Sequence, residues 1–532
     1  MWVMLGGEQH LARSATMSRG RAGWRRWLPV VPVLTLFAVG CSPAQGGTAS
    51  QGHSTSRGHS TSGGQSRLAA QRANRAAARI GEWTAPFDVG VVAIHSQVMP
   101  GGKVLMWAYP RSTVGTWTVV LDPTTRTFTN VSMSYQRDAF CSGNDLLPNG
   151  DVFLSGGHLF NGVNPSTHED DLGAANTDIF DPAAESWTPG PTLDKDRWYP
   201  TNVELGNGNI LIFAGQVKPG KMARTVDEYN PTTNKMSVLP ATADRTQPVY
   251  PRMTLLPNGK LLDSEPNKGT ELFDPATDRW SWLGNTQLGQ ARSEGNTVLL
   301  PGLNKVLIAG GRNGAMGATN TAEVIDFSKA NPAWHYTGSM RYARAYANAV
   351  LLADGTVLEV GGGTGAPYKS PVYTAELYNP ATGTWSTMAA QTAPRVYHST
   401  AVLLPSGQVL SAGMDSGTYQ TTAEIYSPPY LFHGPRPAIS SAPSSVGYGE
   451  SFAISTRSAS RIKRVALVKP SGATHAMGQD QRYVDLSITH TSTTELTVTA
   501  PPDGNHAPPG WYMLFIVNSH GVPSVASWVR VG

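Results

Sequence analysis

Short apolar runs alternate with turns along residues 81–436. Each unit of this pattern has an apolar run, a turn that contains glycine and a second apolar run that ends in small residues. An acidic-x-aromatic-Asp/Asn-Pro element follows, usually with a tryptophan after it. Short runs bounded by Asn-Gly or Asp-Gly turns are typical of hairpin strands, so each unit predicts four β-strands. The seven turns begin at Pro100, Pro148, Gly206, Pro257, Pro301, Ala353 and Pro405.

The unit recurs every 44 to 58 residues. A lone four-stranded sheet cannot bury both of its apolar faces, so the seven units should stack radially as the blades of a β-propeller. The period and the Gly-Gly pairs, such as Gly156-Gly157, resemble kelch blades. Helical repeats are the rival for this period, but the apolar runs are too short for helices. The fold class predicted is therefore all-β, with a seven-bladed kelch-type propeller at residues 81–436.

The repeat stops near residue 436. Residues 437–532 contain alternating strand-like runs such as SFAISTRSA, RVALVKP and WYMLFIVNS, separated by turns of ordinary length. This pattern predicts an immunoglobulin-like β-sandwich domain without a disulfide.

The amino terminus, residues 1–41, has the pattern of an export signal. Arginines including Arg25 and Arg26 precede an apolar run from Trp27 to Gly40, which is too short for a permanent membrane span. The run ends at Cys41, as in a bacterial lipoprotein signal, and the paired arginines also allow twin-arginine export. A plain secretory signal removed together with Cys41 is the alternative. Each of these readings predicts an extracytoplasmic protein, secreted or lipid-anchored at a bacterial cell surface.

Composition distinguishes residues 1–80 from the rest of the chain. Residues 42–80 are rich in Gly, Ser, Thr and Gln and then in Ala and Arg, which predicts a flexible low-complexity linker. The net charge is +4, but residues 1–80 contain ten Arg and only one acid, so the remainder is mildly acidic. A nucleic-acid partner is therefore not expected.

One position of the repeat is unusually polar. It lies seven residues before each turn, where the innermost strand begins, and we expect its side chains to surround the mouth of the central channel. Small or aliphatic residues would suffice there for structure, yet six of the seven are polar or reactive. The seven positions are Ala93, Cys141, Tyr199, Tyr250, Glu294, Tyr346 and His398.

Three of these positions, Cys141, Tyr199 and His398, suggest chemistry together with one neighbour, Tyr397. Cys141 is the sole cysteine after Cys41, and a lone thiol is unusual in an oxidising compartment, although burial as a small apolar residue would also explain it. Tyr199 could be a packing aromatic. Tyr397 and His398 offer a phenol and an imidazole side by side, and histidine is a common transition-metal ligand, although a lone histidine is more often hydrogen-bonded in a core.

Four motifs in order resemble those of the copper radical oxidases, the family of galactose oxidase and glyoxal oxidase. They are FCSG at Cys141, RWYP at Tyr199, RVYHS at Tyr397 and His398, and THAMGQDQR at His475. RWYP is nearer to the glyoxal oxidase branch. The resemblance covers residues 81–532 and implies one copper ion, with Tyr199, His398 and His475 as equatorial ligands and Tyr397 as the axial ligand and base.

The resemblance also implies a thioether bond between Cys141 and the Tyr199 ring, giving a modified tyrosine that stores a radical. His475 would reach the metal from the second domain. The expected activity is oxidation of a primary alcohol or aldehyde, free or at a glycan end, with O2 reduced to H2O2. The rivals are a non-catalytic kelch lipoprotein that binds carbohydrate or protein, and a structural cell-wall lipoprotein with an inert ring.

The substrate wall and the radical shield are less defined. We expect Tyr250, Arg252, Glu294 and Tyr346 to line the substrate side, with Arg344 nearby, although tyrosine and arginine there could equally be ordinary residues of the propeller surface. The galactose oxidase branch has a tryptophan over the modified tyrosine in a loop that here reads AGQVKPGKMAR, which contains none. Trp198, Trp282 and Trp334 are the candidates to replace it. The protein is expected to be a monomer that meets a membrane only through a lipid on Cys41.

Overall fold

Antiparallel β-strands form almost all of the secondary structure. The computed structural model describes residues 61–110, 115–159, 172–313, 317–365 and 369–532. The export signal and Cys41 lie outside these ranges. Within them, no helix is long and apolar enough to cross a membrane. Residues Ala70–Gly532 form one compact unit.

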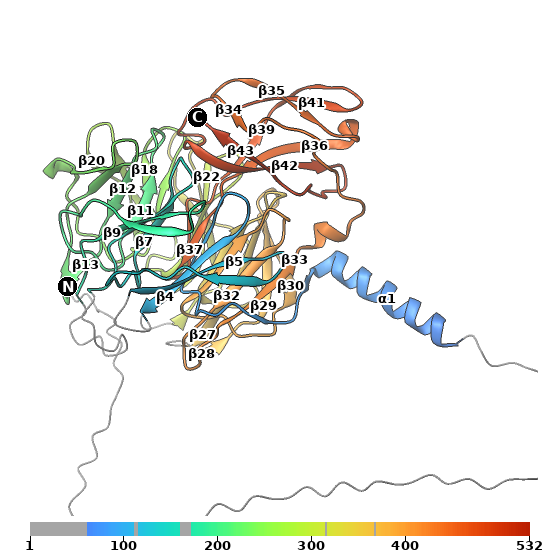
Figure 1. The fold of residues 1–532 in the computed structure, drawn as a ribbon, viewed down its shortest axis with the longest axis horizontal. Coiled ribbons are helices and arrows are strands. Elements are labelled where there is room, and N and C mark those ends of the chain that lie inside the picture. The colour runs from blue at the N-terminus through green and yellow to red at the C-terminus, as the bar shows by residue number, and fades with distance from the viewer. Residues whose placement is uncertain (1–60, 111–114, 160–171, 314–316, 366–368) are drawn as a thin grey trace, which may run out of the picture. The chain divides into compact units, whose positions relative to one another are not determined.

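Seven sheets follow one another in chain order in the described residues, each with four strands at its centre (Figure 1). The first three are β3 (His95–Val98), β4 (Val104–Pro110), β5 (Thr116–Asp122) and β6 (Thr127–Asn130); β7 (Gly143–Leu146), β8 (Val152–Ser155), β9 (Thr177–Asp181) and β10 (Ser186–Pro189); and β11 (Thr201–Glu204), β12 (Ile210–Phe213), β15 (Asp227–Asn230) and β16 (Lys235–Val238). The next two are β17 (Met253–Leu255), β18 (Leu261–Asp263), β19 (Gly269–Asp274) and β20 (Arg279–Asn285); and β21 (Ser293–Leu299), β22 (Lys305–Asn313), β24 (Ala322–Asp326) and β25 (Trp334–Tyr336). The last two are β26 (Ala345–Leu351), β27 (Val357–Gly365), β29 (Thr374–Asn379) and β30 (Thr384–Ala390); and β31 (Ser399–Leu403), β32 (Val409–Gly413) and β33 (Thr422–Ser427) with β1 (Glu82–Trp83).

The seventh sheet is completed by the start of the folded region. Strand β1 pairs antiparallel with β33, with Glu82 opposite Ser427 and Trp83 opposite Tyr426. The hydroxyl of Tyr426 also donates to the carbonyl of Ile80, at 2.7 Å. Segments more than 300 residues apart are therefore joined within one sheet.

A buried ion pair recurs in five of the sheets. An arginine just before the first strand pairs with a carboxylate on the third strand of the same sheet, and both side chains are at most 2% exposed. A buried charge is tolerated only when it is paired, so the pair fixes where the first strand begins. The pairs are Arg137–Asp178, Arg197–Asp227, Arg292–Glu323, Arg344–Glu376 and Arg395–Glu424.

The Gly-Gly pairs join neighbouring sheets. The second glycine donates its N–H to the carbonyl of the next sheet's buried arginine, from Gly157 to Arg197 at 2.8 Å and from Gly362 to Arg395 at 2.7 Å. The first glycine has a left-handed backbone, and a Cβ on Gly361 would collide with the Arg395 carbonyl. These positions therefore require glycine.

Two further sheets lie in residues 437–532. One has the order β34 (Ser445–Val446), β43 (Ser527–Val531), β42 (Gly510–Asn518), β36 (Ile462–Val468) and β39 (Tyr483–Leu486). The other is β35 (Ser451–Ser455), β41 (Glu495–Thr499) and β40 (Ile488–Thr491). Their apolar side chains share one buried cluster, which includes Ile454 and Val498 from one sheet and Leu467 and Leu514 from the other.

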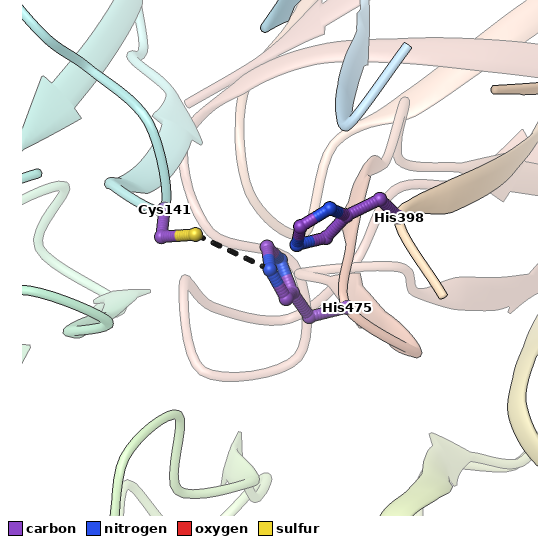
Figure 2. A group of neighbouring side chains, drawn as sticks. All are labelled: Cys141, His398 and His475. Atoms are coloured by element: carbon purple, nitrogen blue, oxygen red, sulfur yellow. Dashed lines mark hydrogen bonds between the residues drawn. The ribbon is translucent and has the colours of Figure 1, made fainter. Parts of the chain in front are cut away.

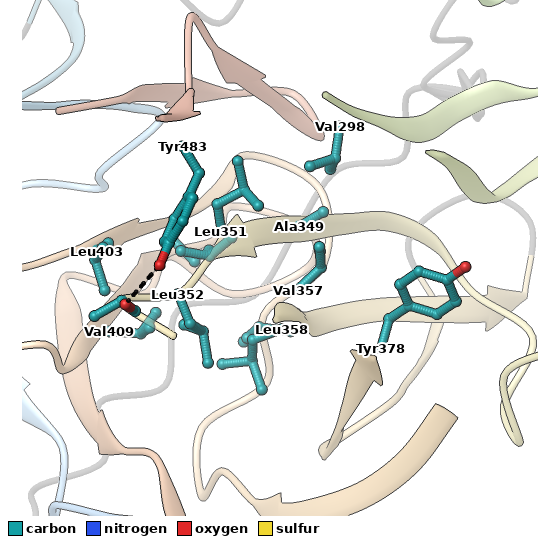
Figure 3. Close-up of a cluster of buried hydrophobic side chains, with 14 of the residues drawn as sticks. Val298, Ala349, Leu351, Leu352, Val357, Leu358, Tyr378, Leu403, Val409 and Tyr483 are labelled. Atoms are coloured by element: carbon teal, nitrogen blue, oxygen red, sulfur yellow. Dashed lines mark hydrogen bonds between the residues drawn. The ribbon is translucent and has the colours of Figure 1, made fainter. Parts of the chain in front are cut away.

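Another apolar cluster joins this region to the earlier sheets. Tyr483 of β39 belongs to the same buried cluster as Leu351, Leu403 and Val409 (Figure 3). Its hydroxyl donates to the carbonyl of Ala353, at 3.4 Å. Continuous apolar packing, rather than a linker alone, holds residues 437–532 against the sheets.

The linker differs from its prediction. Residues Thr61–Ile80 form the helix α1, although residues 42–80 were expected to be flexible. Alanine and arginine favour helix, and their concentration in this part of the segment outweighs its early Gly and Ser. Gly81, at φ +70°, follows the helix, and its N–H donates to the carbonyl of Ala77, at 2.8 Å. This is a glycine helix C-cap.

Candidate metal centre

The position singled out in the repeat has an unusual backbone. Six of its seven residues have a left-handed φ between +47° and +62°, and Ala93 is the exception. Residues other than glycine rarely adopt this conformation, and where they do it marks strain held by the surroundings, often at a functional site. The six are Cys141, Tyr199, Tyr250, Glu294, Tyr346 and His398.

Backbone hydrogen bonds connect three of these residues in sequence. The N–H of Tyr199 donates to the carbonyl of Cys141 at 2.9 Å, and the N–H of Tyr250 donates to the carbonyl of Tyr199 at 3.0 Å. Three successive sheets are therefore joined at this position, and Cys141 and Tyr199 are direct neighbours.

A hairpin brings His475 to the same place. Strands β37 (Gly472–Thr474) and β38 (Met477–Gln479) extend the first sheet, with Thr474 opposite His95 of β3. His475 and Ala476 form the two-residue turn, with φ of +48° and +62°. Two positive φ values indicate a type I′ turn, which usually contains Asn-Gly. His475 at the tip is therefore a further residue other than glycine with a strained backbone.

The two imidazoles each have one nitrogen fixed by a neighbour. Nδ1 of His398 lies 2.6 Å from Oδ2 of Asp415, and Nδ1 of His475 lies 2.6 Å from the hydroxyl of Thr474. The Thr474 hydroxyl donates to the carbonyl of Ile94, so its oxygen accepts from His475. In both rings Nδ1 thus carries the hydrogen, and Nε2 is the nitrogen that carries the lone pair.

The Nε2 side of both rings faces the thiol of Cys141 (Figure 2). The Cys141 Sγ lies 3.3 Å from Nε2 of His475, and one ligand atom from each of the three residues lies within 4.8 Å of the others. All three side chains are buried, and Nε2 of His398 finds no hydrogen-bond partner in the described residues. A buried orphaned lone pair, with its ring oriented by a carboxylate, fits a transition-metal ligand.

Burial also keeps the His475 ring neutral. The pKa of His475 is well below its usual range because of burial, with His398, His95 and Arg252 adding to the effect. The pKa of Asp415 is lowered: burial alone would raise it, but His398 and the Tyr109 hydroxyl outweigh that effect. Neutral imidazole is the form that binds a metal ion.

Two tyrosines complete the group. The rings of Tyr199 and Tyr397 lie 5.4 and 5.3 Å from the His475 ring, both nearly perpendicular to it. Tyr397 also stacks on His398 at 3.7 Å. The rings of Tyr199 and Tyr397, the two imidazoles and the thiol therefore lie close together, so the structure brings Cys141, Tyr199, Tyr397, His398 and His475 into one group.

Among the three candidate tryptophans, only Trp198 lies against Tyr199, with ring centroids 4.5 Å apart. Trp282 is 62% exposed, and Trp334 is buried with its indole N–H on Thr270. The backbone of Trp198 pairs with Gln216, which lies in the loop where the galactose oxidase branch has its tryptophan. The structure thus selects Trp198 by position.

The residues expected on the substrate side have different surroundings. Glu294 and Arg312 form a partly exposed ion pair at 2.9 Å, and Arg312 lies 5.5 Å over the Tyr346 ring. Tyr250 is buried, and its hydroxyl donates to the carbonyl of Ser142 at 2.9 Å. Tyr346 is also buried, 5.2 Å from the Tyr397 ring.

The two arginines expected there are not open to solvent. Arg252 donates to the carbonyls of Tyr250, Gly295 and His475, and it therefore holds the hairpin tip in place. Arg344 is fully buried in its ion pair with Glu376, so it does not line an open surface. Burial of the guanidinium in an ion pair within its own sheet explains why an arginine occurs there.

Sequence reasoning missed several supporting residues. Asp415, Thr474 and Tyr109 orient the two imidazoles, yet none belongs to the repeated position. His95 was also missed, although it is fully buried and its Nε2 accepts the N–H of Cys141 at 3.2 Å. The signal available in the sequence was a histidine two residues after Ala93.

Known proteins resemble this chain in sequence. Residues 113–430 match the family described as Glyoxal oxidase N-terminus, and residues 436–531 match Galactose oxidase-like, Early set domain. Galactose oxidase of Gibberella zeae is 28% identical over 502 residues, covering 85% of this chain and 71% of that protein. Aldehyde oxidase GLOX of Vitis pseudoreticulata is 30% identical over 442 residues, covering 74% of this chain and 82% of that protein.

A solved structure agrees with these relatives. A fungal alcohol oxidase of the AA5 family, in complex with copper, is 25% identical and has a TM-score of 0.74, covering 85% of this chain and 99% of that one. The chain therefore belongs to the copper radical oxidases, the family of galactose oxidase and glyoxal oxidase. The family that the sequence resembles is confirmed.

Proposed function

We propose that this protein is an extracytoplasmic copper radical oxidase that converts a primary alcohol or aldehyde, free or at a glycan end, while reducing O2 to H2O2. The family supports copper-dependent alcohol or aldehyde oxidation. The observation that carries the proposal for this chain is the convergence of the His398 and His475 lone pairs with the Cys141 thiol within 4.8 Å.

The donor set suits copper. Nε2 of His398 and of His475, with the hydroxyls of Tyr199 and Tyr397, would hold the ion, since imidazole and phenolate are suitable ligands of Cu(II). Asp415 and Thr474 keep the two rings in the tautomer that offers Nε2. When bound, copper supplies a one-electron redox change and a Lewis acid for the substrate oxygen.

The thiol would complete the redox group. In the proposed cross-link, the Cys141 S–H and one ring C–H beside the Tyr199 hydroxyl are lost, and an S–C bond forms. The two hydrogens and their electrons reduce O2 to H2O2. A sulfur-substituted phenol is easier to oxidise than tyrosine, so Tyr199 would hold the second oxidising equivalent that a two-electron reaction needs. Trp198 would shield its ring.

The residues then divide the work on the substrate. Tyr397, stacked on His398, would receive the proton of the substrate hydroxyl, and Tyr199 would accept a hydrogen atom from the adjacent carbon. An alcohol RCH2OH thus becomes RCHO, and its two hydrogens and two electrons end on H2O2. The Glu294–Arg312 pair and Tyr346 would form the substrate wall.

We also infer the finer architecture and setting. The seven sheets would form one kelch propeller, supported by their order along the chain and by β1 completing the seventh sheet. Residues 437–532 would be an immunoglobulin-like sandwich that supplies His475. The signal-like residues 1–41 support export, with lipid on Cys41, and the protein would act as a monomer.

A peroxide-coupled assay tests the function. Copper-loaded protein is offered a panel of small alcohols, aldehydes and glycans with a primary hydroxyl, with Cys141→Ser and His475→Ala as matched controls. We expect peroxide from at least one substrate with the wild type and none above background with either variant. Glycan binding without peroxide from any compound would instead support a non-catalytic binding protein.

A further inference from the structure

We propose that His95 is a positioning residue for the cross-link: its imidazole holds the backbone amide of Cys141 and so aims the thiol. The inference rests on the proposed function, because it concerns how Cys141 and Tyr199 come to react. His95 lies outside the motifs that resemble the family and outside the repeated position.

His95 connects the two parts of the site. Its backbone on β3 pairs with Thr474, the residue just before His475, while its side chain reaches Cys141 at the start of the second sheet. The ring is fully buried and stacks on Trp107 at 4.6 Å and 8° between planes. Stacking in a close-packed core leaves the ring little freedom to rotate.

The hydrogen bond acts on a strained residue. Cys141 has φ +55°, a conformation that persists only when its surroundings fix it. Nε2 of His95 accepts the N–H of Cys141 at 3.2 Å, and the carbonyl of Cys141 accepts the N–H of Tyr199 at 2.9 Å. Both backbone polar groups are thus held, and the Sγ lies 3.3 Å from Nε2 of His475.

The same bond assigns His95 a role other than metal ligation. Its Nε2 lone pair is occupied by the Cys141 amide, so Nδ1 carries the hydrogen. His95 therefore has no free nitrogen lone pair to offer a metal ion, whereas Nε2 of His398 finds no hydrogen-bond partner in the described residues. It acts on the chemistry only through the position of Cys141.

Two nearly isosteric variants separate the acceptor from the packing. His95→Gln keeps an oxygen that can accept the Cys141 N–H, whereas His95→Met fills similar space without a good acceptor. Exposed His490, mutated to Met, is the matched control. Each protein is purified without copper and then given copper and air, and the loss of two hydrogen atoms is followed by intact mass over time.

We expect His95→Met to cross-link about tenfold more slowly than wild type, since one orienting hydrogen bond is lost. His95→Gln should recover most of the rate, with copper stoichiometry unchanged in both. Equal rates for wild type and folded His95→Met would overturn the role of His95 alone. If His95→Met does not fold, the role of His95 is overturned by a folded His95→Gln that cross-links tenfold more slowly than wild type. Wild type that never cross-links would overturn the proposed function and this role with it.

Discussion

Replacing Asp415 by alanine should weaken copper binding by releasing the ring of His398. The Asp415 carboxylate lies 2.6 Å from Nδ1 of His398 and also accepts the Tyr109 hydroxyl at 2.9 Å. It is only 13% exposed, and its pKa is held below the usual range by His398 and Tyr109 against the effect of burial. The ionised carboxylate therefore fixes both the tautomer and the orientation of the ring.

Loss of such an outer carboxylate costs about 10- to 100-fold in metal affinity, or about 1.4–2.7 kcal/mol. We expect Asp415→Ala to fall in this range, because Nδ1 of a buried ring is left without its acceptor. Tyr109→Phe is the control: it removes the second bond to the carboxylate but leaves the bond to His398, so copper affinity should change only a few-fold.

Competition between the copper-free protein and a chelator of known affinity measures both variants at pH 7, with thermal unfolding to check the fold. Copper affinity of folded Asp415→Ala within twofold of wild type would refute the reasoning. In that case either His398 is not a ligand or Asp415 does not orient it.

Three further predictions concern stability. Between pH 7 and pH 5, the free energy of unfolding of the copper-free wild type, measured in urea, should fall by about 2 kcal/mol more than that of His95→Gln. Burial lowers the pKa of His95 to about 3, so only the unfolded chain, in which this pKa is near 6.5, gains the proton in that range. A difference between the two proteins that does not change with pH would contradict this. Gly361→Ala should lower the free energy of unfolding by about 3 kcal/mol or more, since φ is +72° and the new Cβ meets the Arg395 carbonyl. The denaturant midpoint measures this loss, with Gly417→Ala, whose new Cβ meets no atom, as the control. Lys469→Met should lower the free energy of unfolding by about 3–5 kcal/mol, because the buried carboxylates of Glu204 and Asp145 lose their cation. An unchanged midpoint of thermal unfolding would contradict this pairing.

The β-strand pattern was readable because it is local and repeated. The turn at Pro148-Asn-Gly, for example, joins β7 and β8, with the N–H of Gly150 on the carbonyl of Leu147 at 2.8 Å. Alignment on these turns also located Cys141, Tyr199 and His398, which share one backbone conformation as well as one repeat position. A repeat places side chains of the same register in equivalent positions, so this part of the site could be predicted.

The remaining site residues depend on contacts that the repeat does not encode. His475 comes from a hairpin of the last region, and the motif resemblance, not the period, identified it. His95 was missed because it lies two residues after Ala93, outside the repeated position, and its contact with Cys141 joins β3 to the segment just before β7. Asp415 lies two residues after the end of β32 at Gly413, where the sequence is that of an ordinary loop.

The helix α1 shows the limit of composition. Low-complexity sequence predicts disorder on average, but a continuous run of alanine and arginine has its own helical preference. The substrate side shows a second limit: sequence cannot tell an arginine that faces a cleft from one in a buried ion pair within a sheet, as for Arg344.

Peptide mapping of the protein after exposure to copper and air tests the central claim most directly. The account predicts that the fragment with Cys141 and the fragment with Tyr199 remain covalently joined under reducing conditions, lighter than their sum by two hydrogen atoms, and that Cys141→Ser abolishes the joined species. Fragments that separate fully, with Cys141 still a free thiol although copper is bound, would contradict it.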